Sequence, residues 1–188
     1  KLFYEDGYRK EFKARVLSCE QAGGKYKVVL DATAFFPEGG GQYGDIGWLD
    51  DTEVMDTREK DGVIYHTVAS PLKEGTVVTG RLNWEVRFDR MQQHTGEHIV
   101  SGLVHSRFGY DNVGFHLGED YCTMDFNGCI SKEELREIEL EANRAVFANL
   151  RVGITYPSRE ELIAMEYRSK IEIEGQVRII TIPGYDVC

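Results

Sequence analysis

The sequence is poor in proline and cysteine and has no long apolar run. Four prolines and four cysteines occur among 188 residues, and 41% of the chain is hydrophobic against 29% charged. This composition argues against a disordered or fibrous chain. Apolar runs are only a few residues long, whereas crossing a bilayer takes about 20, and the first residues lack an apolar signal segment. We therefore expect a folded globular protein with no membrane partner and no secretion signal.

Basic residues are also in short supply. Lysine and arginine total 22 against 32 aspartates and glutamates, which gives a formal charge of -10. This excess argues against broad binding of nucleic acid through a basic surface, and no DNA partner is expected. It leaves room for one local contact. The cysteines show neither a C-x-x-C pair nor the dense spacing of a disulfide scaffold, so a reducing compartment, the cytoplasm, is favoured.

The first half of the chain has the pattern of short β-strands separated by turn residues. The predicted strands are 15–20, 25–31, 46–49, 53–57, 63–68 and 76–82. The first two are predicted to form a β-hairpin, because a Gly-Gly turn separates them and Tyr26, Val28 and Leu30 alternate with other residues after it. Six short strands in succession predict a small β-barrel.

Helical spacing begins after Trp84 and predicts a helix that runs to Phe108. Capping boxes, in which a serine is followed three residues later by a glutamate, predict helices beginning after Ser131 and after Ser158, the latter ending near Tyr167. The apolar face predicted for the helix after Ser131 consists of Leu135, Ile138, Ala142, Ala145, Val146 and Asn149. Further strands are predicted at 121–126, 152–155 and 177–182.

The expected fold class is therefore α+β, with an N-terminal small β-barrel followed by an α/β module. The change of periodicity near Trp84 puts the domain boundary there. We predict a barrel domain over 1–85, which carries a glycine-rich loop, and a second domain over 86–188.

The segment His94-Thr95-Gly96-Glu97-His98 lies inside the first predicted helix. Two histidines four residues apart stand on one helix face roughly 6 Å apart, so both imidazoles could bind one metal ion. Zinc would need one or two further ligands, and the alternative is that the histidines only cap or pack. The segment also fits the H-x-x-E-H pattern of inverted zinc peptidases, with Glu97 as general base. His105 is too far along the helix to share the ion, and we expect it to pack.

The second chemical feature is the glycine run in Phe36-Pro37-Glu38-Gly39-Gly40-Gly41-Gln42. Glycines allow unusual backbone angles and let main-chain amides approach a ligand closely. The run is not a nucleotide P-loop, because the Lys-Ser/Thr ending and the following helix are missing. Taken alone, the pattern favours an ordinary turn.

Taken together, these segments resemble the editing domain of alanyl-tRNA synthetases and the free-standing alanyl-tRNA editing proteins of the AlaX type. Residues 36–42 with 45–47 are similar to the family's Pro-Glu-Gly-Gly-Gly-Gln signature. Residues 90–98 resemble its zinc helix, and residues 113–118 its pocket strand. The resemblance runs over nearly the whole chain in the family's order.

The resemblance implies hydrolysis, in trans and without ATP, of mischarged tRNA(Ala). Serine, or glycine, would be released from the ester at the 3′-terminal adenosine. The implied cofactor is Zn²⁺, with His94 and His98 as two ligands. The family completes its zinc shell with a C-x-x-x-H motif that is expected just past Cys188, so the second domain is expected to be truncated. The implied partner is the acceptor end of the mischarged tRNA(Ala).

The resemblance also implies a substrate pocket, for which no catalytic residue is assigned. The expected pocket residues are His116, Gly39, Gly40, Gly41 and Gln42, with Thr33 and Glu119 as weaker candidates. Zinc could activate water, polarise the ester, or hold the 3′ end of the tRNA. Two alternatives stay open: an inactive tRNA-binding fragment and the zinc peptidase. A cluster of Arg81, Arg87, Arg90 and Arg107 is a hypothetical tRNA contact.

Overall fold

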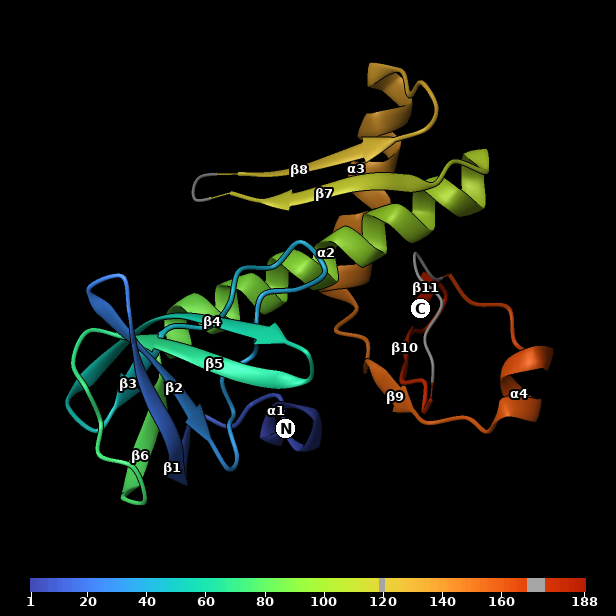
Figure 1. The fold of residues 1–188 in the computed structure, drawn as a ribbon. Helices are drawn as coiled ribbons and strands as arrows, with labels where there is room; N and C mark the ends of the chain where they lie inside the picture. The colour runs from blue at the N-terminus through green and yellow to red at the C-terminus, as the bar shows by residue number, and fades with distance from the viewer. Residues whose placement is uncertain (119–120, 169–174) are drawn as a thin grey trace. The chain divides into compact units, whose positions relative to one another are not determined.

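A computed structural model describes residues 1–118, 121–168 and 175–188 of the chain (Figure 1). These residues form two compact units. The first comprises Lys1–Gln92 and His116–Tyr121, and the second comprises Gln93–Phe115 and Cys122–Cys188. The predicted division into domains 1–85 and 86–188 stays a prediction.

The first unit is a closed antiparallel β-barrel, as predicted. Its strands are β1 (Glu11–Ala22), β2 (Lys25–Leu30), β3 (Gly47–Leu49), β4 (Thr52–Lys60), β5 (Val63–Val68) and β6 (Val77–Leu82). They follow one another around the barrel as β1-β2-β5-β4-β3-β6, and β1 pairs with β6 to close it. A short helix that the sequence pattern did not predict, α1 (Leu2–Glu5), precedes the barrel and buries Phe3.

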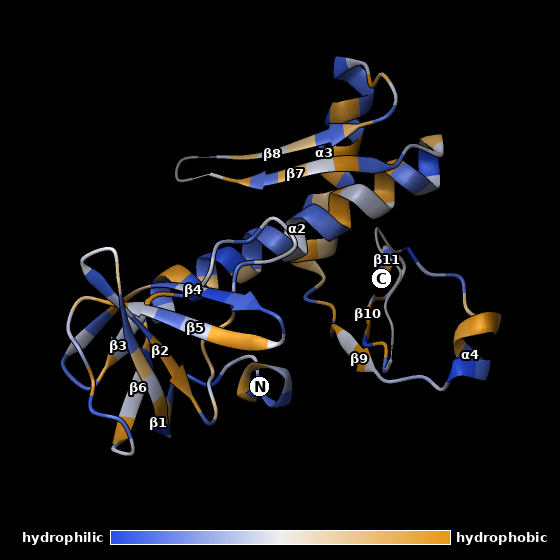
Figure 2. Cartoon of the chain, in the orientation of Figure 1, coloured by the Kyte–Doolittle hydropathy of each residue, from blue (hydrophilic) through white to orange (hydrophobic). Residues whose placement is uncertain are grey.

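Alternation of side chains explains why these segments form a barrel. On β1, Phe12, Ala14 and Val16 are buried while the residues between them are exposed. Figure 2 shows hydrophobic and hydrophilic residues mixed along the barrel strands. Successive side chains of a strand point to opposite faces, so one apolar face of each strand fills the interior. Phe35, from the segment between β2 and β3, belongs to this core and is fully buried.

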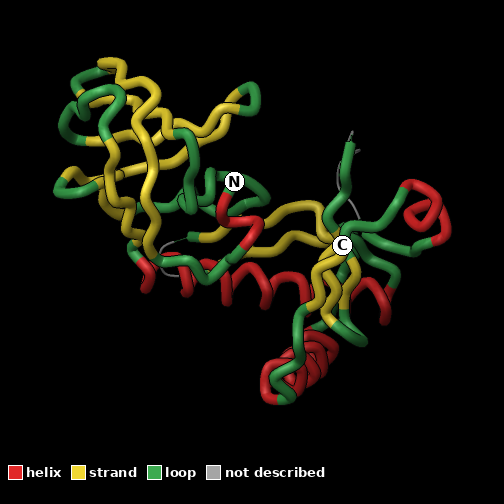
Figure 3. The backbone as a smooth tube through the Cα atoms, turned by 90° about the horizontal axis from the view of Figure 1, so that it is seen from below, coloured by secondary structure: helices red, strands yellow, loops and turns green. Residues whose placement is uncertain are grey.

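Helix α2 (Trp84–Phe108) is the 25-residue helix that the sequence predicted, and Figure 3 shows it as one long coil. Its first residues, through Gln92, belong to the first unit, and the rest belongs to the second. Of the helices that the structure describes, none combines the length and the apolar character needed to cross a bilayer.

The second unit contains the remaining helices and two small sheets. Its elements are β7 (Asn112–Leu117, whose end belongs to the first unit), β8 (Cys122–Phe126), α3 (Lys132–Phe147), β9 (Gly153–Thr155), α4 (Arg159–Ala164), β10 (Ile179–Ile182) and β11 (Asp186–Val187). β7 pairs with β8, and β10 lies between β9 and β11. Ile99 of α2, Ala145 of α3 and Ile182 of β10 form a buried core cluster in this unit. The predicted α+β class is confirmed.

Two expectations about these helices need correction. Both predicted capping boxes form, but α4 ends at Ala164, because Met165 already has extended backbone angles. On α3 only Ile138 and Ala145 are buried, whereas Leu135 and Val146 are 54% and 67% exposed. The helix packs through one narrow stripe against α2 and β10, so the wider predicted face is wrong.

Candidate metal centre

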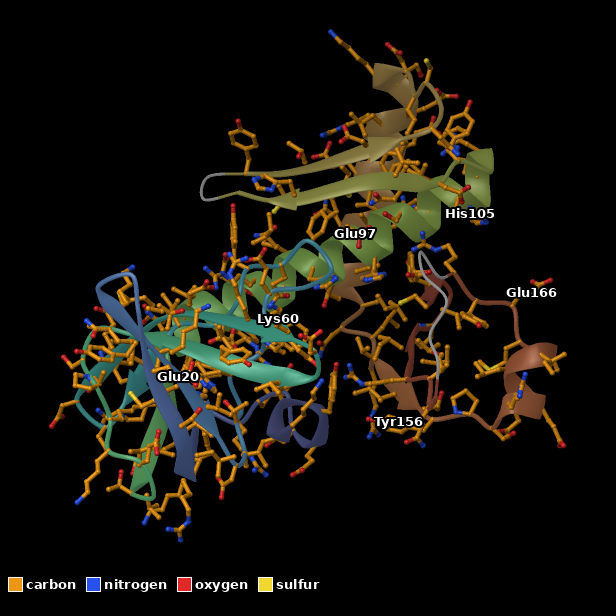
Figure 4. All side chains as sticks on the ribbon, in the orientation of Figure 1. Glu20, Lys60, Glu97, His105, Tyr156 and Glu166 are labelled. Carbon is orange, nitrogen blue, oxygen red and sulfur yellow. The ribbon has the colours of Figure 1, made fainter. Side chains whose placement is uncertain are left out.

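Helix α2 brings His94 and His98 together in the second unit. Their rings stack with centroids 5.2 Å apart and planes 20° apart, as expected for neighbours one turn apart on a helix. Glu97 lies beside them, and one ligand atom from each of these three residues lies within 4.8 Å of the others. Figure 4 shows Glu97 on α2, with His105 nearer the end of the helix.

A second group of possible ligands shares His98 with the first. His98, Asp186 and Cys188 also present ligand atoms that lie within 4.8 Å of one another. Ligands of one zinc ion, bound at 2.0–2.3 Å, are about 3–4 Å apart, and imidazole, thiolate and carboxylate are the groups that zinc prefers. The donor set around His98 therefore fits a zinc ion in its chemistry.

The Asp186 carboxylate is held by contacts with Arg168 and His98. Arg168 donates to both of its oxygens, from Nε to Oδ1 and from Nη2 to Oδ2, each at 2.7 Å. His98 Nδ1 lies 2.8 Å from Oδ2. Burial alone would raise the pKa of Asp186, but the hydrogen bonds from His98 and Arg168 outweigh it and lower the pKa to about 2. Asp186 is therefore a carboxylate at neutral pH and can only accept hydrogen bonds.

The surroundings of His98 favour a positive charge at this place. Burial lowers its pKa, but the hydrogen bonds to Asp186 and Cys188 and the negative charges of Cys188 and Glu97 raise it to about 10 in the metal-free protein. A metal ion would displace this proton, because only neutral imidazole ligates. A proton and a metal cation thus compete for the imidazole of His98, and the negative charges around it favour either one.

Glu97 is held by a buried polar network. It is 6% exposed, and its Oε1 accepts hydrogen bonds of 2.6 Å from both Ser101 Oγ and Asn112 Nδ2. Its Oε2 lies 3.6 Å from His98 Nε2. One oxygen is therefore tied to the protein interior, and the other faces the histidine pair.

The cysteine, histidine and aspartate do not form a nucleophilic triad. Cys188 Sγ lies 3.4 Å from His98 Nδ1, the same ring nitrogen that contacts Asp186. A triad needs the nucleophile and the carboxylate on opposite ring nitrogens, so that one orients the base while the other loses its proton. The arrangement suits metal binding better than covalent catalysis.

The glycine-rich loop is a tight turn in the first unit, as its pattern alone favoured. Gly39 and Gln42 exchange both backbone hydrogen bonds, at 3.0 and 3.1 Å. Gly40 and Gly41 have φ of 62° and 82°, which glycine adopts without strain. Because the amides of Gly39 and Gln42 are used inside the turn, only the two exposed tip amides could approach a ligand.

Asp45 anchors this loop at its base. Its Oδ2 accepts a 2.7 Å hydrogen bond from the amide of Phe36, and it forms a buried ion pair with Arg87. Arg87 is only 5% exposed. The hypothesis that Arg87 contacts tRNA is therefore wrong, because the buried carboxylate of Asp45 requires this guanidinium as its counter-ion.

The remaining predicted site residues have varied surroundings. Thr33 is 4% exposed and bonds His66 Nε2 at 2.9 Å inside the barrel. His116 is exposed and lies edge-on to the ring of Tyr43, with centroids 6.0 Å apart. The loop, Thr33 and His116 belong to the first unit, whereas His94 and His98 belong to the second. Their roles at a pocket stay predictions, and Glu119 lies outside the described residues.

Sequence patterns missed two residues of this centre and misjudged His105, which lies on the same helix. Arg168 carries no sequence signal, because it meets Asp186 only through the fold. Asp186 had one weak signal, its position two residues before Cys188. His105 was expected to pack, but its side chain is 47% exposed and lies 3.0 Å from Asp111.

Comparison with known proteins confirms the family resemblance. Residues 7–86 match the family of class II (A) tRNA synthetases. The whole chain is 36% identical to the alanyl-tRNA editing protein AlaX-L of Pyrococcus horikoshii and covers 48% of it. Over 98% of the chain it is 31% identical to the alanyl-tRNA editing protein Aarsd1 of Mus musculus, of which it covers 49%. It is 38% identical over 99% of its length to the alanine–tRNA ligase of Pyrococcus furiosus, of which it covers 21%. The chain thus spans about half the length of these editing proteins.

Proposed function

The chain is related over its whole length to AlaX-type alanyl-tRNA editing proteins, and on this premise we propose that it is a hydrolase that removes the wrong amino acid from mischarged tRNA(Ala) in trans. The observation that carries the proposal is the group of His94, Glu97 and His98 on α2. This group lies where the resemblance expects the zinc helix. The substrate bond is the ester at the 3′ end of the acceptor strand.

His94 and His98 would hold the zinc ion in the second unit. Further ligands are expected from the C-x-x-x-H motif past Cys188. Cys188 itself lies next to His98. When bound, zinc polarises an ester oxygen or lowers the pKa of a water molecule. The protein's own part is to orient the two imidazoles and to keep Glu97 buried beside them.

To hydrolyse Ser-tRNA(Ala) but spare Ala-tRNA(Ala), the protein must recognise one hydroxyl group, because serine differs from alanine by that group alone. A site that hydrogen-bonds the hydroxyl rejects the analogue that lacks it, since its buried polar groups would otherwise stay unpaired. We propose that the tip amides of Gly40 and Gly41, together with Gln42, His116 and Thr33, contribute this pocket. Release of glycine would need a smaller pocket rather than a new hydrogen bond.

The test of this function is a deacylation assay on Ser-tRNA(Ala), Gly-tRNA(Ala) and Ala-tRNA(Ala), with zinc and a chain that continues past Cys188. We expect fast release from a mischarged tRNA, slow release from Ala-tRNA(Ala), and loss of release in His94→Ala. His105→Ala is the matched control, because His105 lies exposed on the same helix outside the metal group. Absence of release from all three tRNAs by the zinc-loaded protein would contradict the proposal and favour a tRNA-binding fragment.

The peptidase alternative has a separate readout. It requires Glu97 as a general base, and Glu97 Oε2 does face His98. Cleavage of peptide substrates that is lost in Glu97→Ala would support the peptidase. We expect no peptide cleavage.

A further inference from the structure

One carboxylate outside the predicted ligand set meets the candidate metal ligand His98 directly. We propose that Asp186, held by Arg168, is a positioning residue that fixes the His98 ring with its proton on Nδ1 and leaves Nε2 to bind the metal ion. This inference rests on the metal site of the proposed function. It adds to that site the group that orients one of its ligands.

The hydrogen bond between His98 and Asp186 determines which nitrogen is available. The distance from Nδ1 to Oδ2 is 2.8 Å, and the side chain of Asp186 is 2% exposed. Because a carboxylate only accepts, Nδ1 must carry the hydrogen, and neutral His98 then has its lone pair on Nε2. Nε2 is also the nitrogen that lies 3.6 Å from Glu97, a member of the donor group shared with His94.

Asp186 is better placed to orient a ligand than to act as one. Both of its oxygens already accept from the Arg168 guanidinium, in the paired geometry that gives strong and directional hydrogen bonds. A metal ion on either oxygen would have to compete with this cation. Metal-binding histidines commonly donate their second ring nitrogen to a carboxylate, which fixes the ring and strengthens the ligand.

Backbone contacts hold Asp186 and Arg168 in place independently of any metal. Asp186 pairs with Ile182 in the β10–β11 hairpin, and the amide of Arg168 donates to the carbonyl of Val187 at 2.8 Å. The hairpin can approach α2 because Gly102 has no side chain: a Cβ there would lie 2.0 Å from the carbonyl oxygen of Tyr185. The fold therefore builds the carboxylate beside His98 in advance.

The experiment is a measurement of zinc affinity by competition with a chelator, on the full-length natural polypeptide. We expect Asp186→Ala to weaken zinc binding about 10- to 100-fold. Asp186→Asn keeps an oxygen that can accept from His98, so a smaller loss is expected. The matched control is Asp111→Ala, because His105 Nδ1 and Asp111 Oδ1 form a similar contact of 3.0 Å at an exposed place in the same unit. Its zinc affinity should equal that of the wild type.

The second readout is the tautomer of His98 in the zinc-loaded protein, from long-range ¹H–¹⁵N correlation spectra. We expect the proton on Nδ1 in the wild type, and loss of this single tautomer in Asp186→Ala. Unchanged affinity in Asp186→Ala would overturn the proposal. Equal losses in Asp186→Ala and Asp186→Asn with the His98 tautomer unchanged would also overturn it, because Asp186 would then be a ligand itself.

The outcome for the proposed function is decided separately. A wild-type protein that binds no zinc overturns the positioning role, while release of the amino acid from mischarged tRNA would still support the deacylase. Conversely, if the protein binds zinc but releases no amino acid from any tRNA, the deacylase proposal is contradicted. The zinc affinities of the Asp186 variants still decide the role of Asp186.

Discussion

His66 of the barrel is fully buried and His98 of the second unit is partly buried, with 28% of its side chain exposed, and their pKa values shift in opposite directions. Burial lowers the pKa of His66 to about 4, with only a hydrogen bond to the Val28 carbonyl opposing it. Burial also lowers the pKa of His98, but Asp186, Cys188 and Glu97 outweigh it and raise the value to about 10. Burial by itself therefore does not decide the charge of a histidine; the neighbouring hydrogen-bond partners and negative charges do.

The two aspartate–arginine pairs show the same difference between the units. Burial dominates at Asp45 and raises its pKa despite Arg87, whereas hydrogen bonds from His98 and Arg168 lower the pKa of Asp186. Asp45 bonds the backbone of its own loop, and its Oδ1 has no partner among the described residues. In the barrel, the Asp45–Arg87 pair thus holds a loop in place. In the second unit, Asp186 and Glu97 place negative charge beside the imidazole of His98.

Removing the counter-ion of Asp45 should have the largest effect on stability. We expect Arg87→Met to lower the free energy of unfolding by about 3–5 kcal/mol at neutral pH, because it leaves a buried carboxylate without its partner. The loss should shrink in acid, where Asp45, with its raised pKa, takes up a proton. Denaturant unfolding at two pH values measures both effects. Arg58→Met, which removes two exposed ion pairs of the same barrel, with Glu38 and Asp56, is the control and should change little.

The buried neutral His66 predicts acid sensitivity of the barrel. Its folded pKa of about 4 lies below the unfolded value of 6.5, so the unfolded chain binds the proton more readily between these values. Stability should therefore be full above pH 6.5 and fall by about 3 kcal/mol as the pH drops toward 4. In His66→Asn this contribution should be missing from the curve of unfolding free energy against pH. Equal pH dependence in both proteins would show that His66 is not responsible.

The close approach of the β10–β11 hairpin to α2 should be broken by one methyl group. Gly102→Ala places a Cβ 2.0 Å from the Tyr185 carbonyl oxygen, so we expect a loss of about 1–3 kcal/mol and a weaker contact between His98 and Asp186. Thermal unfolding and the histidine NMR signals report the two effects. Gly96→Ala is the matched control on the same helix, because a Cβ there meets nothing within 4 Å. It should be neutral or slightly stabilising, since alanine favours the helix.

The smallest expected effect concerns a local signal of the second unit. Ser131→Ala removes the cap of α3, in which Ser131 accepts from the amide of Glu134, and should cost about 1 kcal/mol of unfolding free energy. Ser131→Asp keeps an acceptor at the cap and should stay close to the wild type. A loss in the aspartate variant as large as in the alanine variant would show that the hydrogen bond is not what matters.

Much of the fold could be predicted because its signals are local. Alternation along 25–31 predicted a barrel strand, turn residues marked off 63–68 as another, and the serine–glutamate boxes predicted the starts of α3 and α4. The errors came where packing decides, as in the exposed Leu135 and Val146 of α3. A helical stripe shows which residues could be buried, but the number of elements that pack against it determines how many are.

In the candidate site, too, local features could be predicted from the sequence and long-range contacts could not. The sequence by itself determined the neighbouring positions of His94 and His98, because a spacing of four residues on a helix brings two side chains to one face whatever surrounds them. It likewise determined the Gly40–Gly41 turn, since the positive φ angles there suit glycine. Only the tertiary structure decided that Asp186 meets both His98 and Arg168 and that Arg87 is buried with Asp45. These contacts join residues that are distant along the chain, so no local pattern announces them, and only the packing of the fold aligns the partners.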